Sequence, residues 1–385
     1  MPVKLPIYLD NHATTPVDPH VFEAMKPYLT DVFGNAASST HEVGWKAEAA
    51  IEKALEQVAH LIHAEPKEIL WTSGTTESIN LAVIGAAQSY RNRGNHIITC
   101  VTEHRSSLGP SKHLETIGFK VTFLPVDSEG CLDPNDLKKA ITPQTILISL
   151  MAANNEIGTI HPIRKIGKIA KERGILFHVD AAQGCGRIPI DVEEMGIDLL
   201  SMSAHKVYGP KGAGALYIRK KNPNVRIAPI LYGGSQEGEI RPGTLAVPNV
   251  AGMGKAFEIA GENLAKESEE ILRLREKLKE GILKNLDNVF LNGHPTQRLA
   301  GNLNLSFPPL RSSDILSDLR GVAVSSGSAC ASGSLEPSYV LKALGVGDER
   351  GRSSIRFGIG RFNTEEEIDY ATQAVTRTVK KLRQR

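Results

Sequence analysis

Short apolar runs alternate with segments of helical periodicity through the first two thirds of the chain. The segment 42–62 repeats its apolar side chains at a spacing close to that of a helix, which predicts a long amphipathic helix. The run 145–150 is apolar at most positions, as expected for a strand that is covered on both faces of a parallel sheet. This alternation predicts a doubly wound α/β domain around a mostly parallel sheet.

The remaining expected elements follow the same alternation. Further strands are expected at 68–72, 96–100, 119–124, 177–180, 197–200 and 215–218. Further helices are expected at 17–29, after the turn at 73–78, at 133–141 and at 162–173. The stretch 250–286 is helical and heavily charged, which indicates a solvated face. We expect it to lead from a large domain, residues 16–255, into a smaller α+β domain made of residues 1–15 and 256–385.

Composition narrows the class of protein. The chain has 385 residues, of which 41% are hydrophobic, so an ample core and two domains are expected. A formal net charge of +2 gives no reason to expect binding to nucleic acid or to a membrane surface. No apolar run approaches the roughly 20 residues of a transmembrane helix, and residues 1–6 have no signal-peptide core. We expect a cytoplasmic protein, or one from a reducing organelle matrix if a targeting segment was removed.

The four cysteines are widely scattered. There is no Cys-x-x-Cys pair, so neither a disulfide framework nor a metal site is predicted. Cys100 lies in an apolar run and is expected in the core, and Cys131 and Cys185 are expected to be structural. Cys330 differs because the stretch 324–334 around it is rich in glycine and serine and has little to pack. It is a candidate reactive thiol, and the alternative is an incidental surface thiol.

Lys206 is the central candidate for chemistry. It lies in a glycine-rich loop between the expected strands at 197–200 and 215–218. A buried lysine loses its charge readily, which makes it a candidate for a Schiff base, whereas the alternative is an amine that reaches solvent. Asp180 ends another expected strand, and ligands bind at that edge of an α/β sheet. An acid beside such a lysine is the pair that pyridoxal phosphate needs, because the carboxylate keeps the pyridine nitrogen protonated.

A phosphate site is expected where the strand at 68–72 ends. A glycine turn leads there into a helix that begins with Thr75 and Thr76. Helix N-termini offer free N–H groups and a partial positive charge, so they bind phosphate. The alternative is an ordinary helix cap by Ser73 or Thr75. Because Lys206 and Asp180 occur in the same chain, we favour phosphate binding.

Two more candidates follow expected strands. His104 comes after the strand at 96–100, and Asn155 comes after the strand at 145–150. His104 suits proton transfer because its ordinary pKa lies near neutrality, although a surface-loop histidine would look the same. Arg356 lies in a short strand near the end of the chain. Its guanidinium fork suits an amino-acid carboxylate, and the alternative is a structural ion pair.

The segments Asp180-Ala181-Ala182-Gln183 and Ser203-Ala204-His205-Lys206 resemble those of fold-type I pyridoxal phosphate enzymes of the class V aminotransferase family. Among these, the chain is most similar to the cysteine desulfurases of the NifS/IscS type. The resemblance runs from Tyr8-Leu9-Asp10-Asn11 to the segment 356–361, nearly the whole chain. It implies that Lys206 holds pyridoxal phosphate covalently and that Asp180 holds the ring nitrogen.

The same resemblance assigns further roles. It implies that His104 stacks on the cofactor ring and that Asn155 lies beside the ring oxygen and the substrate carboxylate. Gln183, Ser203 and His205 are expected to position the ring oxygen and the phosphate. Thr244 is expected to reach the cofactor phosphate of the neighbouring chain in a homodimer. Asn35, Arg356 and the arm at His12 and Ala13 are expected near the substrate, although the arm could simply pack on the core.

The run Ser325-Ser326-Gly327-Ser328-Ala329-Cys330 resembles the longer-loop group of these enzymes, in which the loop cysteine carries a persulfide. A mobile loop suits this task because the sulfur must leave a buried substrate and then reach an outside acceptor. The resemblance implies conversion of L-cysteine to L-alanine and supply of sulfur for iron–sulfur cluster assembly or other thio-cofactors. The persulfide of Cys330 would then ligate an iron–sulfur cluster transiently.

Three alternatives remain open at this point. The chain could be a selenocysteine lyase, another fold-type I enzyme such as an aminotransferase, or a sulfur carrier without catalysis. The expected partners are L-cysteine, a second copy of the chain and an acceptor such as an iron–sulfur scaffold protein. Members of the IscS branch continue past the last helix with a tail that contacts the scaffold, whereas this sequence ends at 380–385 soon after it. The identity of the acceptor is therefore left open.

Overall fold

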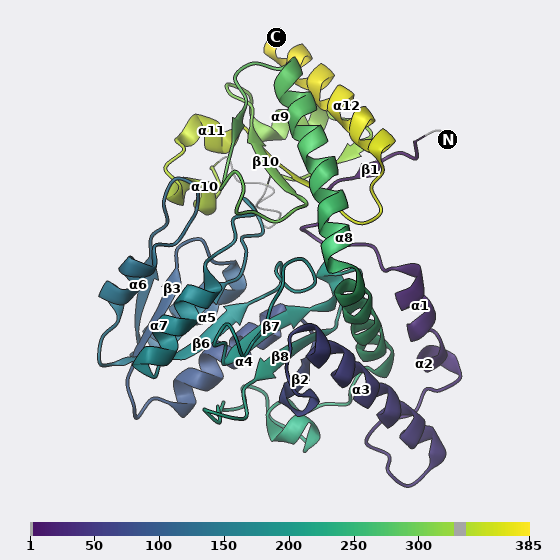
Figure 1. The fold of residues 1–385 in the computed structure, drawn as a ribbon, viewed down its shortest axis with the longest axis vertical. Helices are drawn as coiled ribbons and strands as arrows, with labels where there is room; N and C mark the ends of the chain where they lie inside the picture. The colour runs from purple at the N-terminus through teal and green to yellow at the C-terminus, as the bar shows by residue number, and fades with distance from the viewer. Residues whose placement is uncertain (1–2, 327–335) are drawn as a thin grey trace.

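The computed structural model describes residues 3–326 and 336–385. A seven-stranded sheet in the order β2-β8-β7-β6-β5-β3-β4 forms the centre of the larger part of the molecule (Figure 1). Its neighbouring strands are parallel except for β8, which runs antiparallel to both β7 and β2. The mostly parallel sheet is therefore confirmed. Its strands are β2 Ile69–Thr72, β3 His96–Cys100, β4 Lys120–Leu124, β5 Thr145–Met151, β6 Leu176–Asp180, β7 Leu199–Ser203 and β8 Gly214–Ile218.

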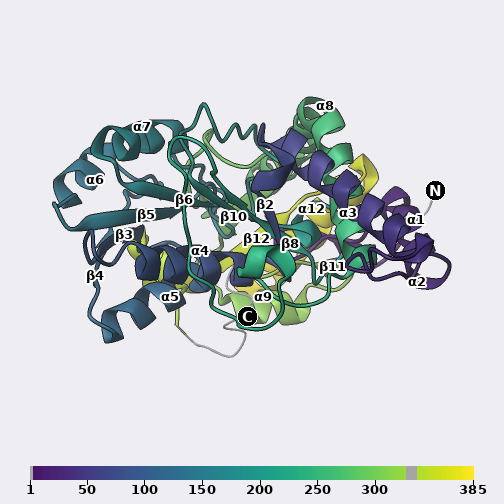
Figure 2. The same cartoon turned by 90° about the horizontal axis from the view of Figure 1, so that it is seen from below.

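Successive residues of these strands pack on opposite faces of the sheet. Ile148 and Phe177 belong to the hydrophobic cluster that includes α3 and α7, whereas Leu147 and Leu176 belong to the cluster under α4. All seven residues of β5 are buried, as expected for a strand with helices on both faces. Figure 2 shows α6 and α7 on one side of the sheet and α4 and α5 on the other. The covering helices are α3 Glu42–Leu61, α4 Thr75–Ser89, α5 Arg105–Thr116, α6 Pro134–Ala140 and α7 Ile163–Arg173.

One expected helix is divided in two. The segment predicted as a single helix at 17–29 forms α1, Pro19–Met25, and α2, Pro27–Thr30. Pro27 has no N–H group to donate to the preceding turn, which explains the break. The start is as predicted, because the side chain of Asp18 accepts a hydrogen bond from the backbone of His20 and caps α1.

A second group of elements packs around its own hydrophobic cluster. It contains a three-stranded antiparallel sheet, a parallel pair of two-residue strands, and several helices. The elements are β1 Ile7–Tyr8, β9 Phe290–Leu291, β10 Asn302–Ser306, α9 Ser312–Asp318, β11 Val322–Ala323, β12 Ser354–Gly358 and α12 Glu365–Arg383. Two short helices, α10 Tyr339–Ala343 and α11 Asp348–Arg352, precede β12, and α10 packs in a separate small cluster with Ile157. The domain limits proposed from the sequence, residues 16–255 and residues 1–15 with 256–385, stay a prediction.

Helix α8, Val247–Asn285, joins the two clusters. Met253 and Phe257 pack in the cluster of the central sheet, and Leu274 and Leu278 pack in the second cluster (Figure 1). The first residues of the chain return to the second cluster, where Ile7 is buried. No helix in residues 3–326 or 336–385 is long and apolar enough to cross a membrane.

Candidate active site

A cavity of roughly 530 Å³ lies where several strands of the central sheet end. The carboxyl ends of β2, β3, β5, β6 and β7 meet at this edge, because these strands run in one direction. The N-terminal arm, residues 9–15, and β12 border the cavity from the other side. Most of the predicted site residues line it: His12, Ala13, Thr75, Thr76, His104, Asn155, Asp180, Gln183, Ser203, His205, Lys206 and Arg356.

Lys206 ends the short 3-10 helix that follows β7, Ala204–Lys206. Its amine donates hydrogen bonds to the backbone oxygens of His12 at 2.8 Å and Ala13 at 2.6 Å. Burial, followed by the charges of Arg187 and Arg356, lowers the pKa of Lys206 to about 7. Near neutral pH a large fraction of this amine is therefore uncharged, which is the form that attacks an aldehyde. Lys206 as a whole is half-buried, and two backbone carbonyls hold its amine; its covalent role stays a prediction.

Asp180 is the last residue of β6 and lies between Met151 of β5 and Ser201 of β7. The backbone N–H of Ala182 donates to its Oδ1 at 2.9 Å. Burial raises the pKa of Asp180 to about 6, although this hydrogen bond and the charge of Lys206 act in the opposite direction. Within residues 3–326 and 336–385 no cation forms an ion pair with it. A protonated ring nitrogen would supply the charge that this buried carboxylate lacks.

The start of α4 is prepared for an anion. Its cap residue is Gly74, which has a φ of +152° and offers no side chain to the first turn. The hydroxyl of Ser73 donates instead to Glu77, so neither Ser73 nor Thr75 caps the helix. The Oγ1 atom of Thr75 is buried and has no hydrogen-bond partner among the described residues. These unused donors fit a phosphate at the helix N-terminus.

Close packing of two glycines holds this helix start against the sheet. A Cβ atom at Gly214, on β8, would lie 2.5 Å from the backbone of Gly74. Both Thr72 and Ser203 are paired with Gly214 in the sheet, so the ends of β2 and β7 lie on either side of it. The phosphate candidates and the Lys206 loop are thereby brought to the same place.

His104 is the cap residue of α5, and its ring faces the cavity region as a neutral imidazole. Its Nδ1 atom accepts a hydrogen bond from the backbone of Ser106, so the remaining proton is on Nε2. Burial lowers the pKa of His104, and the charges of Lys206 and Arg105 act in the same direction. His205 is also neutral, because burial and then Lys206 lower its pKa to about 4.

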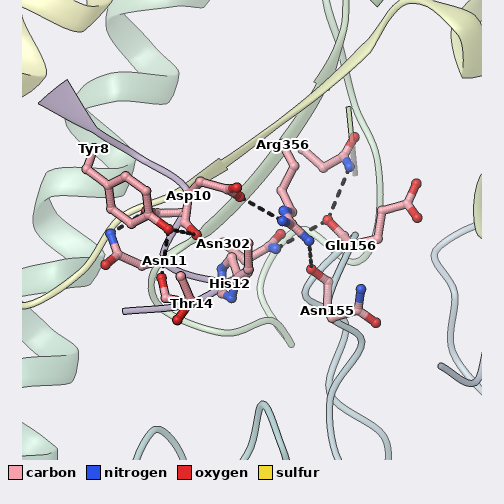
Figure 3. A network of polar contacts seen from close by, with 12 residues as sticks. Tyr8, Asp10, Asn11, His12, Thr14, Asn155, Glu156, Asn302 and Arg356 are labelled. Atoms are coloured by element: carbon pink, nitrogen blue, oxygen red, sulfur yellow. Dashed lines mark hydrogen bonds and ion pairs between the residues drawn. The ribbon is translucent and has the colours of Figure 1, made fainter. Parts of the chain in front are cut away.

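Arg356 crosses from the second cluster into the cavity wall. Its Nη2 atom donates to Oδ1 of Asp10 at 2.7 Å, and its Nη1 atom donates to the backbone oxygen of Asn155 at 2.8 Å. Figure 3 shows the guanidinium between these two residues. The side chain is only 2% exposed, and the ion pair with Asp10 accounts for much of its charge compensation. The structural ion pair, which was the alternative to a substrate-binding role for Arg356, is therefore present. The guanidinium also borders the cavity.

Taken together, the donors and acceptors fit pyridoxal phosphate. An uncharged amine for the aldehyde, a carboxylate for the ring nitrogen and a helix N-terminus for the phosphate face one cavity. Gln183 contributes less freely than expected, because its Nε2 atom already donates to the backbone oxygen of His12 at 2.9 Å. One N–H of that amide remains to bind a ring oxygen.

Two predicted residues lie away from the cavity, and a third cannot be placed. Asn35 is exposed, and its Oδ1 atom accepts a hydrogen bond from Ala37. Thr244 is also exposed and does not line the cavity of its own chain. Cys330 lies outside the described residues. The roles predicted for these three stay predictions.

Sequence reasoning gave no role to four residues that the structure brings to the site. Asp10 holds Arg356, Arg187 contacts the loop of Lys206, and Glu156 and Tyr339 line the cavity. Arg187 offered a weak signal, because it is a charged residue in the small and apolar stretch that follows Asp180. The other three gave none that local pattern could detect.

Comparisons with known proteins agree with this geometry. The family model of the class-V aminotransferases matches residues 7–371. Cysteine desulfurase IscS of Anaeromyxobacter sp. (strain K) is 54% identical over 382 residues, which are 99% of this chain and 94% of that protein. The structure of a NifS-like protein has a TM-score of 0.90 at 38% identity and covers 98% of this chain and 100% of its own. The structure of SspA in complex with cysteine has a TM-score of 0.82 at 37% identity and covers 93% of this chain and 100% of its own.

Proposed function

The chain belongs to the class-V aminotransferase family, and from that membership we propose that it is a pyridoxal phosphate-dependent cysteine desulfurase. The observation that carries the proposal is the pairing of Lys206 with Asp180 across the ends of β7 and β6 in one cavity. The similarity to enzymes named cysteine desulfurase, and to a structure with bound cysteine, supports L-cysteine as the substrate.

Eight residues of the cavity would hold the cofactor. Lys206 would bind it covalently, Asp180 would pair with the ring nitrogen, His104 would cover one face of the ring and Gln183 would bind the ring oxygen. Thr75, Thr76, Ser203 and His205 would bind the phosphate, together with the N-terminal N–H groups of α4. When bound, the cofactor supplies an electron sink that stabilises negative charge on the substrate.

The chain's own groups would bind cysteine and move its protons. Arg356 and Asn155 border the cavity together and would receive the substrate carboxylate. The amine of Lys206 has a pKa of about 7, so it can both accept and return a proton near neutral pH. His104 is neutral and carries its proton on Nε2, which allows it to donate.

Cys330 would take the sulfur. Burial raises the pKa values of Cys100 to about 11 and of Cys185 to about 12, and the pKa of Cys131 is about 11 for the same reason, with Asp127 and Glu129 adding to it. These three thiols carry almost no thiolate at neutral pH, which leaves Cys330 as the candidate nucleophile. Its sulfur forms a bond to the substrate sulfur while the substrate C–S bond breaks. The carbon keeps the electron pair and gains a proton, so the products are a Cys330 persulfide and alanine.

The Cys330 persulfide is proposed to supply sulfur for iron–sulfur cluster assembly or for another thio-cofactor. A reducing compartment such as the cytoplasm suits it, because a reactive thiol stays reduced there until it is loaded.

Alanine formation without a second substrate tests the proposal. We expect the pure holoenzyme to convert L-cysteine to equimolar alanine and sulfide when dithiothreitol is present and no keto acid is added. An aminotransferase would need the keto acid, because it must pass the amino group on. A selenocysteine lyase would turn over selenocysteine and leave cysteine unchanged. Alanine would be measured by amino-acid analysis, and a strict requirement for a keto acid would refute the desulfurase.

A homodimer is proposed as the active unit. The segment from α1 to the first turn of α3 exposes large apolar side chains, with Leu29 56%, Phe33 72% and Trp45 53% exposed. Exposed apolar area of this kind is typical of surfaces that a partner covers. Thr244 faces solvent in the single chain, and in a dimer its hydroxyl would reach the neighbouring cofactor phosphate.

Thr244→Val is expected to weaken retention of pyridoxal phosphate about tenfold, the loss of one hydrogen bond to a charged group. Retention would be measured from the visible absorbance during dialysis, and mass by sedimentation. Ser235→Ala removes a hydroxyl from the same exposed loop and should change nothing. A monomeric wild-type protein, or equal retention by Thr244→Val and wild type, would exclude the assignment in trans.

A further inference from the structure

Arg187 lies behind the cavity, seven residues after Asp180, and its partly exposed side chain points back toward the N-terminal arm. Its guanidinium contacts three separate segments of the chain. Nη1 donates to Oε1 of Gln183 at 2.5 Å and to Nδ1 of His12 at 2.9 Å. Nη2 donates to the backbone oxygens of Asn11 at 2.9 Å and Lys206 at 2.8 Å. One side chain therefore links the arm, the turn after β6 and the loop of Lys206.

His12 is neutral among these contacts. Its Nδ1 atom lies 2.9 Å from Nη1 of Arg187 and 3.0 Å from Oε1 of Gln183, so it accepts from the guanidinium in one tautomer and donates to the amide oxygen in the other. Burial and the charge of Arg187 both lower the pKa of His12 well below its ordinary value, in agreement with that state. The amide of Gln183 completes the arrangement, because it accepts from Arg187 and donates to the backbone oxygen of His12.

The same arm carbonyls receive the amine of Lys206. The backbone oxygen of His12 accepts from both Gln183 and Lys206, and the next carbonyl, that of Ala13, accepts from Lys206 as well. Arg187 thus holds the lysine at both ends. It binds the backbone oxygen of Lys206 directly, and it holds the arm whose carbonyls bind the amine.

We propose that Arg187 is a positioning residue for Lys206, whose backbone and whose amine acceptors it fixes with one guanidinium. The proposal rests on the proposed function of Lys206. It goes beyond that function, because Arg187 need not touch substrate or cofactor. Among the described residues no carboxylate forms an ion pair with Arg187, since its four acceptors are two carbonyls, an amide and an imidazole. Its charge is therefore left to act on its surroundings.

The charge has a consequence for Lys206. After burial, Arg187 is the largest influence that lowers the pKa of that amine, ahead of Arg356. The carboxylates of Asp10 and Asp180 act in the opposite direction. The remaining titratable groups that face the amine are the neutral imidazoles of the site: His12, His104 and His205. A residue that only tied the backbone together would not shift this pKa.

The test uses the full-length chain without cofactor and three variants. Lys206 is acetylated with limiting reagent between pH 5 and pH 10, and the modified peptide is quantified by mass spectrometry. The wild-type midpoint is expected near 7. Arg187→Met should raise the midpoint by about one unit or more, because a nearby cation is lost. Arg187→Lys keeps the charge and should keep the midpoint, but one amine cannot serve four acceptors. The Arg187→Lys protein should therefore retain pyridoxal phosphate about tenfold less tightly than wild type.

Arg219→Met is the matched control. Arg219 is a buried arginine that, like Arg187, donates to backbone oxygens, those of Val192 and Ile197, but it is paired with Glu193 at the far end of β8. We expect its loss to lower the thermal midpoint of unfolding and to leave the acetylation midpoint of Lys206 unchanged. If Arg219→Met and Arg187→Met shifted the acetylation midpoint of Lys206 equally, the shift would come from a general destabilisation of the fold, and the proposal would be overturned.

Two further results would also overturn it. An Arg187→Met protein with the wild-type midpoint and wild-type cofactor retention would exclude any positioning role. If Arg187→Met does not fold, Arg187→Lys decides, and unchanged retention together with unchanged amide exchange in residues 9–15 would count against the proposal. A failure of the desulfurase assignment would give a different pattern of results. Cysteine would not be turned over, but the acetylation midpoint of Lys206 would still differ between wild type and Arg187→Met.

Discussion

Lys206→Ala is expected to lower the rate of cysteine turnover by more than about 10³-fold, because both the covalent attachment of the cofactor and the proton carrier are lost. Among the described residues, the other lysine that borders the cavity, Lys211, is exposed. The imidazoles of His104 and His205 are held neutral by burial and cannot form the same bond to an aldehyde. The variant should also release pyridoxal phosphate on dialysis, since only the contacts of Asp180 and of the α4 N-terminus would remain.

The measurement has two parts. Reduction of the wild-type holoenzyme with borohydride, followed by digestion, should place the label on Lys206, and turnover should be followed as alanine formed. Lys211→Ala is the control, because Lys211 is an exposed lysine that borders the same cavity five residues further on. It should keep its activity and its label. A label on Lys211 or elsewhere in the wild type would contradict the assignment of Lys206.

Cys330→Ala is expected to abolish persulfide formation and to lower sulfide release by at least about 10²-fold, while the visible absorbance of the cofactor is unchanged. The nucleophile would be lost, and no described thiol can replace it, since burial raises the pKa values of Cys100, Cys131 and Cys185 to about 11 or above. Binding of the cofactor depends on other residues, which explains why its spectrum should persist.

Mass spectrometry of the peptide that contains Cys330 gives the direct readout. After incubation of the wild type with cysteine, this peptide should gain the mass of one sulfur atom. Cys131→Ala serves as the control, because Cys131 is the most exposed of the described cysteines. Its loss should affect neither the persulfide nor the rate. Desulfuration at the full rate by Cys330→Ala would show that another group attacks the substrate sulfur.

The carboxyl ends of the strands could be predicted, and with them the core of the site. Asp180, His104 and Asn155 each follow a recognisable apolar run, and Lys206 follows β7 through a short helix. The ends of parallel strands meet at one edge of a sheet, so these residues had to converge once the sheet was predicted. The candidate phosphate site at the start of α4 could be predicted because a strand, a glycine and a helix are consecutive in sequence.

Other contacts of the site could not be predicted from the local sequence. Asp10 and Arg356 are 346 residues apart, and His12 and Gln183 are 171 residues apart. Their hydrogen bonds depend on how the N-terminal arm crosses between the two hydrophobic clusters, which no periodicity of apolar residues encodes. The predicted place of Thr244 could not be checked within one chain, because it requires a second copy of the chain.

The sequence by itself determined the class of fold and the family, and it singled out Lys206 as the candidate for the covalent chemistry. Local spacing fixes secondary structure, and secondary structure fixes which strand ends are neighbours. Only the tertiary structure decided the charge and hydrogen-bond surroundings of those residues. The pKa of Lys206 is about 7 because burial and the charges of Arg187 and Arg356 lower it. Arg187 is in turn held in place by acceptors from three distant segments of the chain. Desolvation and Coulomb interactions depend on distance in space, so they are set only when the chain has folded.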